Sequence, residues 1–247
     1  MLRKILFVFL LFFISFNTHA QNIEVQRLNY NTQDLSSIDK VVVKNLYGDI
    51  RIRQTKQESI VYHAVSQFSE QHKANLFDSV KDKTLFLEIK YPNPPSSDSK
   101  ERVDAVIILP KEIQLQVIIE KGNLSTKTIG NELNIQSEHS DINVKTTNSA
   151  KVFTKTGNIM FSKIPNKASK SIELKTYSGT IRVDYVAKRI PRADVITGSI
   201  VTSNSVRFLK NKTIKNRTQR FRPEKAFDMF KVQSDTGLIH FIEHKEI

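Results

Sequence analysis

The chain of 247 residues contains no cysteine and no tryptophan. Without cysteine there is no disulfide, so the fold must be held together by its buried core. The same absence excludes a structural zinc site built from thiolates and a lipid attached to a processed N-terminal cysteine. Without tryptophan, any stacking platform for a sugar ring must come from tyrosine or phenylalanine.

Long apolar runs are also scarce, because the chain has a single one, at its start. Ten uninterrupted apolar residues, 5–14, follow Arg3 and Lys4 and precede the small residue Ala20. This pattern predicts a secretory signal peptide over residues 1–20, cleaved after Ala20, with an uncleaved signal anchor as the alternative. The run is shorter than the roughly 20 residues of a membrane-spanning helix. We therefore expect no transmembrane anchor and an exported protein, which is periplasmic, outer-membrane-associated or extracellular.

Acidic residues are outnumbered, with 38 Lys and Arg against 25 Asp and Glu and a net charge of +13. An excess of this size favours contact with anionic surfaces, such as acidic glycans or lipid headgroups. The alternative is that lysines on exposed strand faces keep sheet edges soluble. We expect no nucleic-acid partner, because an exported protein rarely meets one. A glycan or another extended polymer of the envelope is the partner we expect, and the oligomeric state is left open.

Glycine is rare as well, and its distribution is the main feature of the sequence. Six of the seven glycines occupy one recurring phrase, in which a short polar residue usually follows the glycine and an aliphatic residue stands two positions after it. A glycine at such a junction provides a positive φ or a close backbone approach. The predicted structural turns are Gly48, Gly122, Gly157, Gly179, Gly198 and Gly237, and a seventh copy has Ser140 in the glycine position.

Aligning the copies on the turn residue produces columns of apolar residues separated by polar ones. The column two positions after the turn contains Ile50, Leu124, Ile142, Ile159, Ile181, Ile200 and Ile239. The column five positions before it contains Val43, Val117, Ile135, Val152, Leu174, Ala193 and Val232. Period-two alternation with β-branched residues predicts strands with one buried face.

Two architectures fit a strand–turn–strand unit that repeats every 17–22 residues. In a parallel β-solenoid each unit is one coil and equivalent residues stack. In an antiparallel meander each glycine would be a hairpin turn. The regular columns favour the solenoid, in which Ile142, Ile159, Ile181 and Ile200 lie one above another. The step of 39 residues before Gly237 indicates a degenerate copy or an insertion.

The chain before the regular repeat is also rich in predicted strands, from residue 39 to residue 109. Between two of them, the polar segment Glu70 to Lys83 is predicted as a short helix with Ala74, Phe77 and Val80 inward. Three prolines in "YPNPPSSDSKER" predict a loop.

The last long gap contains the densest positive charge. From Lys210 to Lys225 there are seven Lys or Arg and one acid, Glu224, with Phe221 among them. Basic residues beside an aromatic ring are typical of a polyanion-binding loop, and a solvated insertion is the alternative. The candidate polyanion-binding residues are Lys210, Lys212, Lys215, Arg217, Arg220 and Arg222.

No pattern of an active site stands out. Asp49 and Asp141 follow turn residues, where Asn, Thr and Ser stand in other copies, so a role in the turn explains both. His240 and His244 would lie about 13 Å apart on a strand, too far for one metal ion. No nucleophile elbow and no phosphate-binding loop is present. We therefore predict no catalytic, cofactor-binding or metal-binding residue, no cofactor, and a protein that is not an enzyme.

Three kinds of phrase follow one another along the chain: Asn-x-x-Gly-x-Ile at Asn45, Gly48 and Ile50, a Leu-Pro pair at Leu109 and Pro110, and repeated Ser/Thr-Gly-x-Ile turns at Gly157, Gly179 and Gly198. In this order they resemble a known family, the bacterial putative adhesin domain. The resemblance covers about residues 39–247 and departs at Ser140 and at the basic insertion. It implies a right-handed β-helix-like solenoid in an exported, non-enzymatic protein with an adhesin-like binding or scaffolding role. A β-helix polysaccharide lyase or hydrolase and an accessory protein of envelope-stress signalling are the alternatives.

The predicted organisation is thus an all-β chain with an irregular β N-terminal part. The predicted segments are a signal peptide at 1–20, an N-terminal segment at 21–38 and one domain at 39–247. Within that domain, regular coils are expected at about 113–205 and 228–247, with the basic insertion at 210–225.

Overall fold

The computed structural model describes residues 22–30, 37–68, 74–94, 100–210, 212–224 and 227–245. The predicted signal peptide lies outside the described residues. Those residues form nineteen strands and one short helix, α2 (Val206–Leu209). The predicted all-β class is therefore confirmed. No helix in the described part of the chain is long and apolar enough to cross a membrane.

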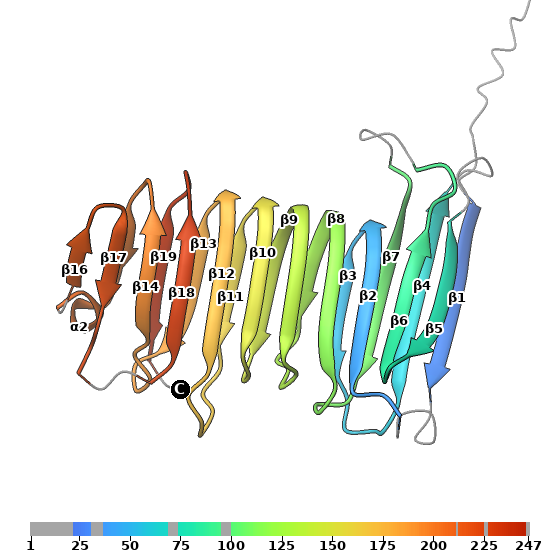
Figure 1. Ribbon diagram of the computed structural model, residues 1–247, viewed down its shortest axis with the longest axis horizontal. Helices are drawn as coiled ribbons and strands as arrows, with labels where there is room; N and C mark the ends of the chain where they lie inside the picture. Colours follow the sequence, from blue (N-terminus) through green and yellow to red (C-terminus); the bar gives the residue numbers. More distant parts are fainter. Residues whose placement is uncertain are drawn as a thin grey trace, which may run out of the picture.

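The strands pair into two rows that extend along the molecule (Figure 1). The first row contains, in spatial order, β5 (Asn75–Lys81), β6 (Thr84–Lys90), β2 (Lys40–Tyr47), the first part of β8 (Gln114–Thr126), the first part of β9 (Leu133–Thr146), β10 (Ala150–Thr156), β12 (Ser171–Ser178), β18 (Met229–Ser234), β14 (Arg192–Thr197), β17 (Thr218–Phe221) and β16 (Lys212–Lys215).

The second row contains β1 (Asn22–Tyr30), β4 (Ile60–Phe68), β7 (Arg102–Leu109), β3 (Ile50–Gln54), the second part of β8, the second part of β9, β11 (Ile159–Lys163), β13 (Ile181–Val186), β19 (Ile239–His244) and β15 (Val201–Ser203).

The two rows belong to one large sheet, because β8 and β9 run through both of them. Neighbouring strands are parallel through the middle of each row. They are antiparallel at the ends, where β1 pairs with β4, β5 with β6, and β16 with β17. The sheet is thus mostly parallel and mixed.

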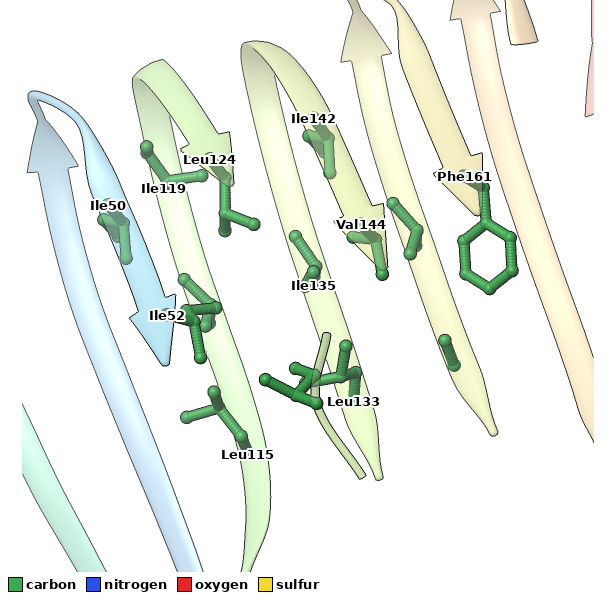
Figure 2. Close-up of a cluster of buried hydrophobic side chains, with 14 of the residues drawn as sticks. Ile50, Ile52, Leu115, Ile119, Leu124, Leu133, Ile135, Ile142, Val144 and Phe161 are labelled. Carbon is green, nitrogen blue, oxygen red and sulfur yellow. The ribbon is translucent and has the colours of Figure 1, made fainter. Parts of the chain in front are cut away.

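The core lies between the rows and comes from the period-two pattern. Along β8, for example, buried Leu115, Val117 and Ile119 alternate with more exposed residues. Figure 2 shows aliphatic side chains of both rows in the space between them. Each fully buried aliphatic side chain contributes roughly 1.5–3 kcal/mol. No single unit can bury its own apolar face, so neighbouring units stabilise each other.

The predicted column is confirmed for its central members. Ile142 is in register with Ile159, and Ile159 with Ile181. The prediction is wrong for Ile200, which is 62% exposed. Val201 takes the place beside Ile239 instead.

The cause is a turn that is one residue shorter than its neighbour. Ala193 pairs with Phe230 and Val201 with Ile239, so Ala193 and Val201 are eight positions apart in the sequence while their partners are nine positions apart. The predicted alignment of Ala193 with Val232 is therefore wrong too, because Val195 pairs with Val232.

The order of the units in space differs from their order in the sequence. The last unit, β18 and β19, lies between the β12–β13 unit and the β14–β15 unit, as Figure 1 shows for β18. After β15 the chain forms α2 and the β16–β17 hairpin before it returns to this position. Unit β2–β3 likewise lies beside β8, although the segments are far apart in the sequence.

The predicted helix between Glu70 and Lys83 is wrong where it is described. Residues 75–81 form strand β5, which pairs antiparallel with β6 through a turn with positive φ at Asp82 and Lys83. Residues 70–73 lie outside the described residues. Ala74 is buried, but Phe77 and Val80 are 47% and 52% exposed. The free backbone edge of β6 explains the difference, because a strand there satisfies polar groups that a helix would leave unpaired.

Candidate functional site

The turn residues stack along one edge of the molecule. Gly48, Gly122, Gly157 and Gly179 have positive φ. A Cβ on Gly157 would lie 2.2 Å from the carbonyl oxygen of Ser140, and one on Gly179 would lie 2.0 Å from the oxygen of Gly157. The turns therefore approach each other too closely for side chains, and the glycines serve the backbone rather than a ligand.

The other three turn copies accommodate the close approach of neighbouring turns in other ways. Gly237 lacks the positive φ, but a Cβ there would lie 1.7 Å from the oxygen of Gly179. Gly198 belongs to the shortened turn and also lacks a positive φ. Ser140 lies inside the continuous strand β9, and its hydroxyl bonds to that of Ser137 at 2.5 Å.

The position after each turn forms a ladder of polar side chains. The Asp49 carboxylate accepts hydrogen bonds from the backbone N–H and side-chain amide of Asn123, at 2.9 and 3.2 Å. Asp141 accepts the same pair from Asn158, at 2.7 and 3.2 Å. Asn158 in turn accepts from the backbone N–H of Thr180. These side chains thus join successive turns, which is a structural task.

A second ladder, of buried hydroxyls, was not anticipated from the sequence. Thr154 donates to the carbonyl oxygen of Ser140, Thr176 to that of Gly157 and Ser234 to that of Gly179. Each hydroxyl satisfies a turn carbonyl of the adjacent unit. The signal was present, because a hydroxyl residue stands three positions before the turn in most copies.

Asn45 performs the equivalent task in the first unit. Its amide donates to the carbonyl oxygen of Val103 at 2.7 Å, and its side-chain oxygen accepts from the Tyr91 hydroxyl at 2.5 Å. Val103 is the residue against which a Cβ on Gly48 would clash. In the opening Asn-x-x-Gly phrase, the longer asparagine side chain therefore takes the place that a Ser or Thr hydroxyl has in later units.

The basic insertion is an end cap as well as a charged surface. Phe221 is fully buried, its ring stacks on that of Phe208 from α2 with centroids 4.6 Å apart, and Phe208 contacts Phe241 at 4.5 Å. These rings cover the core where the second row ends in the short strand β15. Because Phe221 is buried, it offers no surface for stacking on a ligand.

The six candidate polyanion-binding residues fall into two groups. Arg222 and Arg220 both face Asp194, and Arg217 lies 3.8 Å from Asp235. By contrast, Lys210, Lys212 and Lys215 are exposed, and Lys212 lies over the Phe221 ring. The three arginines therefore face two acidic partners within the protein, whereas the three lysines form no ion pair with any of the described residues. Polyanion binding itself stays a prediction.

A pair of buried charged residues lies where the last unit enters the sheet. Asp228 accepts a hydrogen bond from the backbone N–H of Lys170 and offers its own carbonyl oxygen to Arg192. Burial raises the pKa of its carboxyl group, against the attraction of Lys163. Burial lowers the pKa of the Lys163 amine, which donates to two carbonyl oxygens. Asp228 thus holds the last unit between its two neighbours.

The two histidines near the C-terminus form hydrogen bonds to side chains of neighbouring strands. His240 bonds to the Thr202 hydroxyl at 2.6 Å, and His244 bonds to Asp184 at 2.8 Å. Within the described residues there is no group of His, Cys, Asp or Glu that could hold a metal ion.

The outer face of the first row carries polar side chains in register. Gln116 is beside Asn134, Asn134 beside Lys151, and Lys151 beside Glu173. Lys151 and Glu173 form an ion pair at 3.4 Å. A shallow hollow of about 380 Å³ crosses these strands, lined by all four residues together with Lys40 and Gln114. We call this surface the first-row groove.

Comparisons with solved structures found matches to bacterial proteins. A putative cell adhesion protein from Clostridium sporogenes matches with a TM-score of 0.52 at 15% identity, covering 90% of this chain and 100% of that chain. A putative adhesin from Bacteroides fragilis matches with a TM-score of 0.43 at 14% identity, covering 90% and 97%. No protein-family model matches the chain, and no curated protein matches it.

The match with a TM-score of 0.52 shows that the chain shares its fold with a solved protein described as a putative cell adhesion protein. The resemblance to the adhesin domain family, inferred from short phrases, is confirmed at the level of the fold.

Proposed function

We propose that the chain is an exported, non-enzymatic protein of the bacterial envelope that binds or scaffolds an extended polymer. We further propose that its two rows form a right-handed β-helix-like solenoid. The observation that carries the proposal is the first-row groove, in which polar side chains of successive strands lie in register. The shared fold with a protein described as a putative cell adhesion protein supports an adhesin-like role.

The spacing of the groove favours an extended ligand over a compact one. Neighbouring strands in a sheet lie about 4.8 Å apart, so a polymer lying across them meets a new polar side chain at each step. The series contains amides in Gln116 and Asn134 and both signs of charge in Lys151 and Glu173. Such a mixture hydrogen-bonds hydroxyl groups and tolerates scattered charge, which suits a glycan of the envelope.

A binding screen with purified mature chain against glycans and matrix proteins tests this function. The double variant Gln116→Ala, Lys151→Ala removes two contacts from the groove and should weaken binding of a retained glycan at least about 10-fold, at roughly 1 kcal/mol for each lost hydrogen bond. Ser79→Ala, Lys81→Ala on the exposed strand β5 is the matched control and should bind normally. Equal binding by both variants would show that the groove is not the binding surface.

The same experiment separates binding from cleavage by a polysaccharide lyase or hydrolase. Acidic polysaccharides incubated with the protein should keep their length. Shortening that requires Asp49 or Asp141 would overturn the proposal and assign a second task to the turn ladder.

A second candidate surface is the β16–β17 hairpin. We propose that its exposed lysines contribute to polyanion retention. Neutralising Lys210, Lys212 and Lys215 should reduce retention on heparin without a shift in melting temperature. Neutralising Arg220 and Arg222 should in addition lower the melting temperature, because both face Asp194.

A further inference from the structure

The outer face of the second row has an unusual composition at the N-terminal end. Outward positions elsewhere in the rows are mostly polar, but β4 and β7 place Val61, Val65, Val106 and Ile108 there, all half-buried. On the edge strand β1, the side chains of Ile23 and Val25 are 70% and 58% exposed.

Strand pairing gathers these residues into one patch. Val25 pairs with Val65, and Val61 pairs with Ile108. A hollow of about 490 Å³ lies over the patch, and the four half-buried residues of β4 and β7 are among those that line it. His63 lies between Val61 and Val65 on the same face, and both His63 and Arg27 also line the hollow. Apolar side chains gathered inside a polar and basic border mark an interaction site more often than a solvated face.

A stripe of positive charge runs along one side of the patch. Arg51 pairs with Val106 and Arg53 with Ile108, so β3 brings two arginines beside the apolar residues. Lys127 and Lys145 continue the stripe. When the strand pairing is extended to the next positions, Lys127 lies beside Arg53 and Lys145 lies beside Lys127. All four side chains are exposed. None of them forms an ion pair with a described residue.

This arrangement differs from the charges on the first row. There, charges on nearby strands alternate in sign and pair, as Lys151 does with Glu173 and Lys155 with Glu138. Like charges on neighbouring strands are unfavourable, so the stripe is maintained at a cost unless an anionic partner neutralises it. Two acids, Asp49 and Asp104, line the same hollow at its turn end, where Asp104 pairs with Val65. Both already accept hydrogen bonds, and Asp104 also forms an ion pair with Arg102.

We propose that this face docks on an anionic lipid bilayer. We name it the docking face, consisting of Ile23, Val25, the four half-buried residues of β4 and β7, and the stripe Arg51, Arg53, Lys127 and Lys145. The stripe contacts headgroup phosphates, and Ile23 and Val25 enter the boundary between headgroups and acyl chains. A soluble polyanion would use the stripe alone, which leaves the exposed apolar side chains unexplained. The proposal does not depend on the first-row groove.

Co-sedimentation of the mature chain with vesicles tests the proposal. We expect binding to vesicles of phosphatidylcholine mixed with phosphatidylglycerol and none to phosphatidylcholine alone. The triple variant Arg53→Gln, Lys127→Gln, Lys145→Gln should bind roughly 100-fold more weakly, because each basic residue near an anionic surface contributes about a fivefold factor. The triple Lys210→Gln, Lys212→Gln, Lys215→Gln removes the same charge from the far end of the molecule and should bind nearly as well as the parent chain.

The apolar contribution has its own variants. Ile23→Ser, Val25→Ser should weaken binding several-fold even at high salt, where charge attraction is screened. Ile200→Ser, Ile214→Ser is the matched control, because those side chains are 62% and 61% exposed at the opposite end. Equal losses in both triple variants, or no effect of the β1 pair, would overturn the docking face. Heparin retention that depends on the stripe, without vesicle binding, would assign the face to a soluble polyanion instead.

Discussion

The stacking of the turns can be tested by adding one methyl group at Gly157. In Gly157→Ala the new Cβ would lie 2.2 Å from the Ser140 carbonyl oxygen and 2.7 Å from its carbon. Real Cβ contacts essentially never fall below 3.0 Å. The residue also has φ near +130°, a conformation that alanine rarely adopts.

Two costs add up in this variant. The unfavourable backbone conformation costs about 1–3 kcal/mol. Relieving the contact requires the two turns to separate by roughly an ångström, which weakens the hydrogen bonds from Asn158 to Asp141 and from Thr154 to Ser140, at about 1 kcal/mol each. We therefore expect a loss of about 3–5 kcal/mol in the free energy of unfolding. In a chain of this size, that loss lowers the melting temperature by roughly 6–20 °C.

Urea and thermal unfolding followed by circular dichroism measure the loss. Gly130→Ala is the matched control. Gly130 lacks a positive φ, and the three atoms nearest to its added Cβ belong to the flexible side chain of Lys111, at 2.8–3.1 Å, which can move aside. That variant should lie within about 1 kcal/mol of the parent chain. If Gly157→Ala is no less stable than Gly130→Ala, the turns do not stack as the structure has them and the reasoning fails.

Three further perturbations address other parts of the architecture. Thr176→Val should lower the free energy of unfolding by about 1–3 kcal/mol, because it leaves the Gly157 carbonyl without its hydroxyl donor; urea unfolding checks this, and a neutral result would remove the hydroxyl ladder from the stabilising interactions. Phe208→Ala should cost about 3–5 kcal/mol by opening the aromatic cap, with hydrogen exchange rising first in β15 and the β16–β17 hairpin; uniform exchange across both rows would contradict a local cap. Asp228→Asn should change the pH dependence of stability. The raised pKa of Asp228 means that the folded chain binds more protons than the unfolded one above the ordinary value of 3.8, so the stability contributed by this group falls as pH rises from there through the folded pKa. The free energy of unfolding of the variant should therefore rise relative to that of the parent chain as pH rises across that range, as unfolding curves at acidic pH would measure. A difference in this free energy that does not change with pH would refute the assignment.

Much of the fold could be predicted because its signals are local. Alternation along one strand decides which side chains are inward, so the columns through Ile142, Ile159 and Ile181 were correct. The rare glycines marked where the turns come together. The helix expected before Lys83 failed because the segment's own pattern is weak and the free edge of β6 decided its conformation.

The surfaces were harder to predict than the core. Phe221 stood among basic residues in the sequence, and nothing local indicated that Phe208 and Phe241 would bury it. The arginines of the same insertion face Asp194 and Asp235, which lie on other strands. The docking face joins β1, β4, β7, β3, β8 and β9, so its residues are spread over more than a hundred positions and meet only through pairing.

The sequence by itself determined the strand–turn–strand unit, its inward columns and the close approach of its turns. Only the tertiary structure decided which unit lies beside which. All units present nearly the same backbone edge and the same aliphatic columns. The residues of one strand therefore do not specify which other strand it pairs with. The place of β18 and β19 between earlier units was settled by contacts made elsewhere, above all by Asp228 at their entry and by the aromatic cap that closes the end.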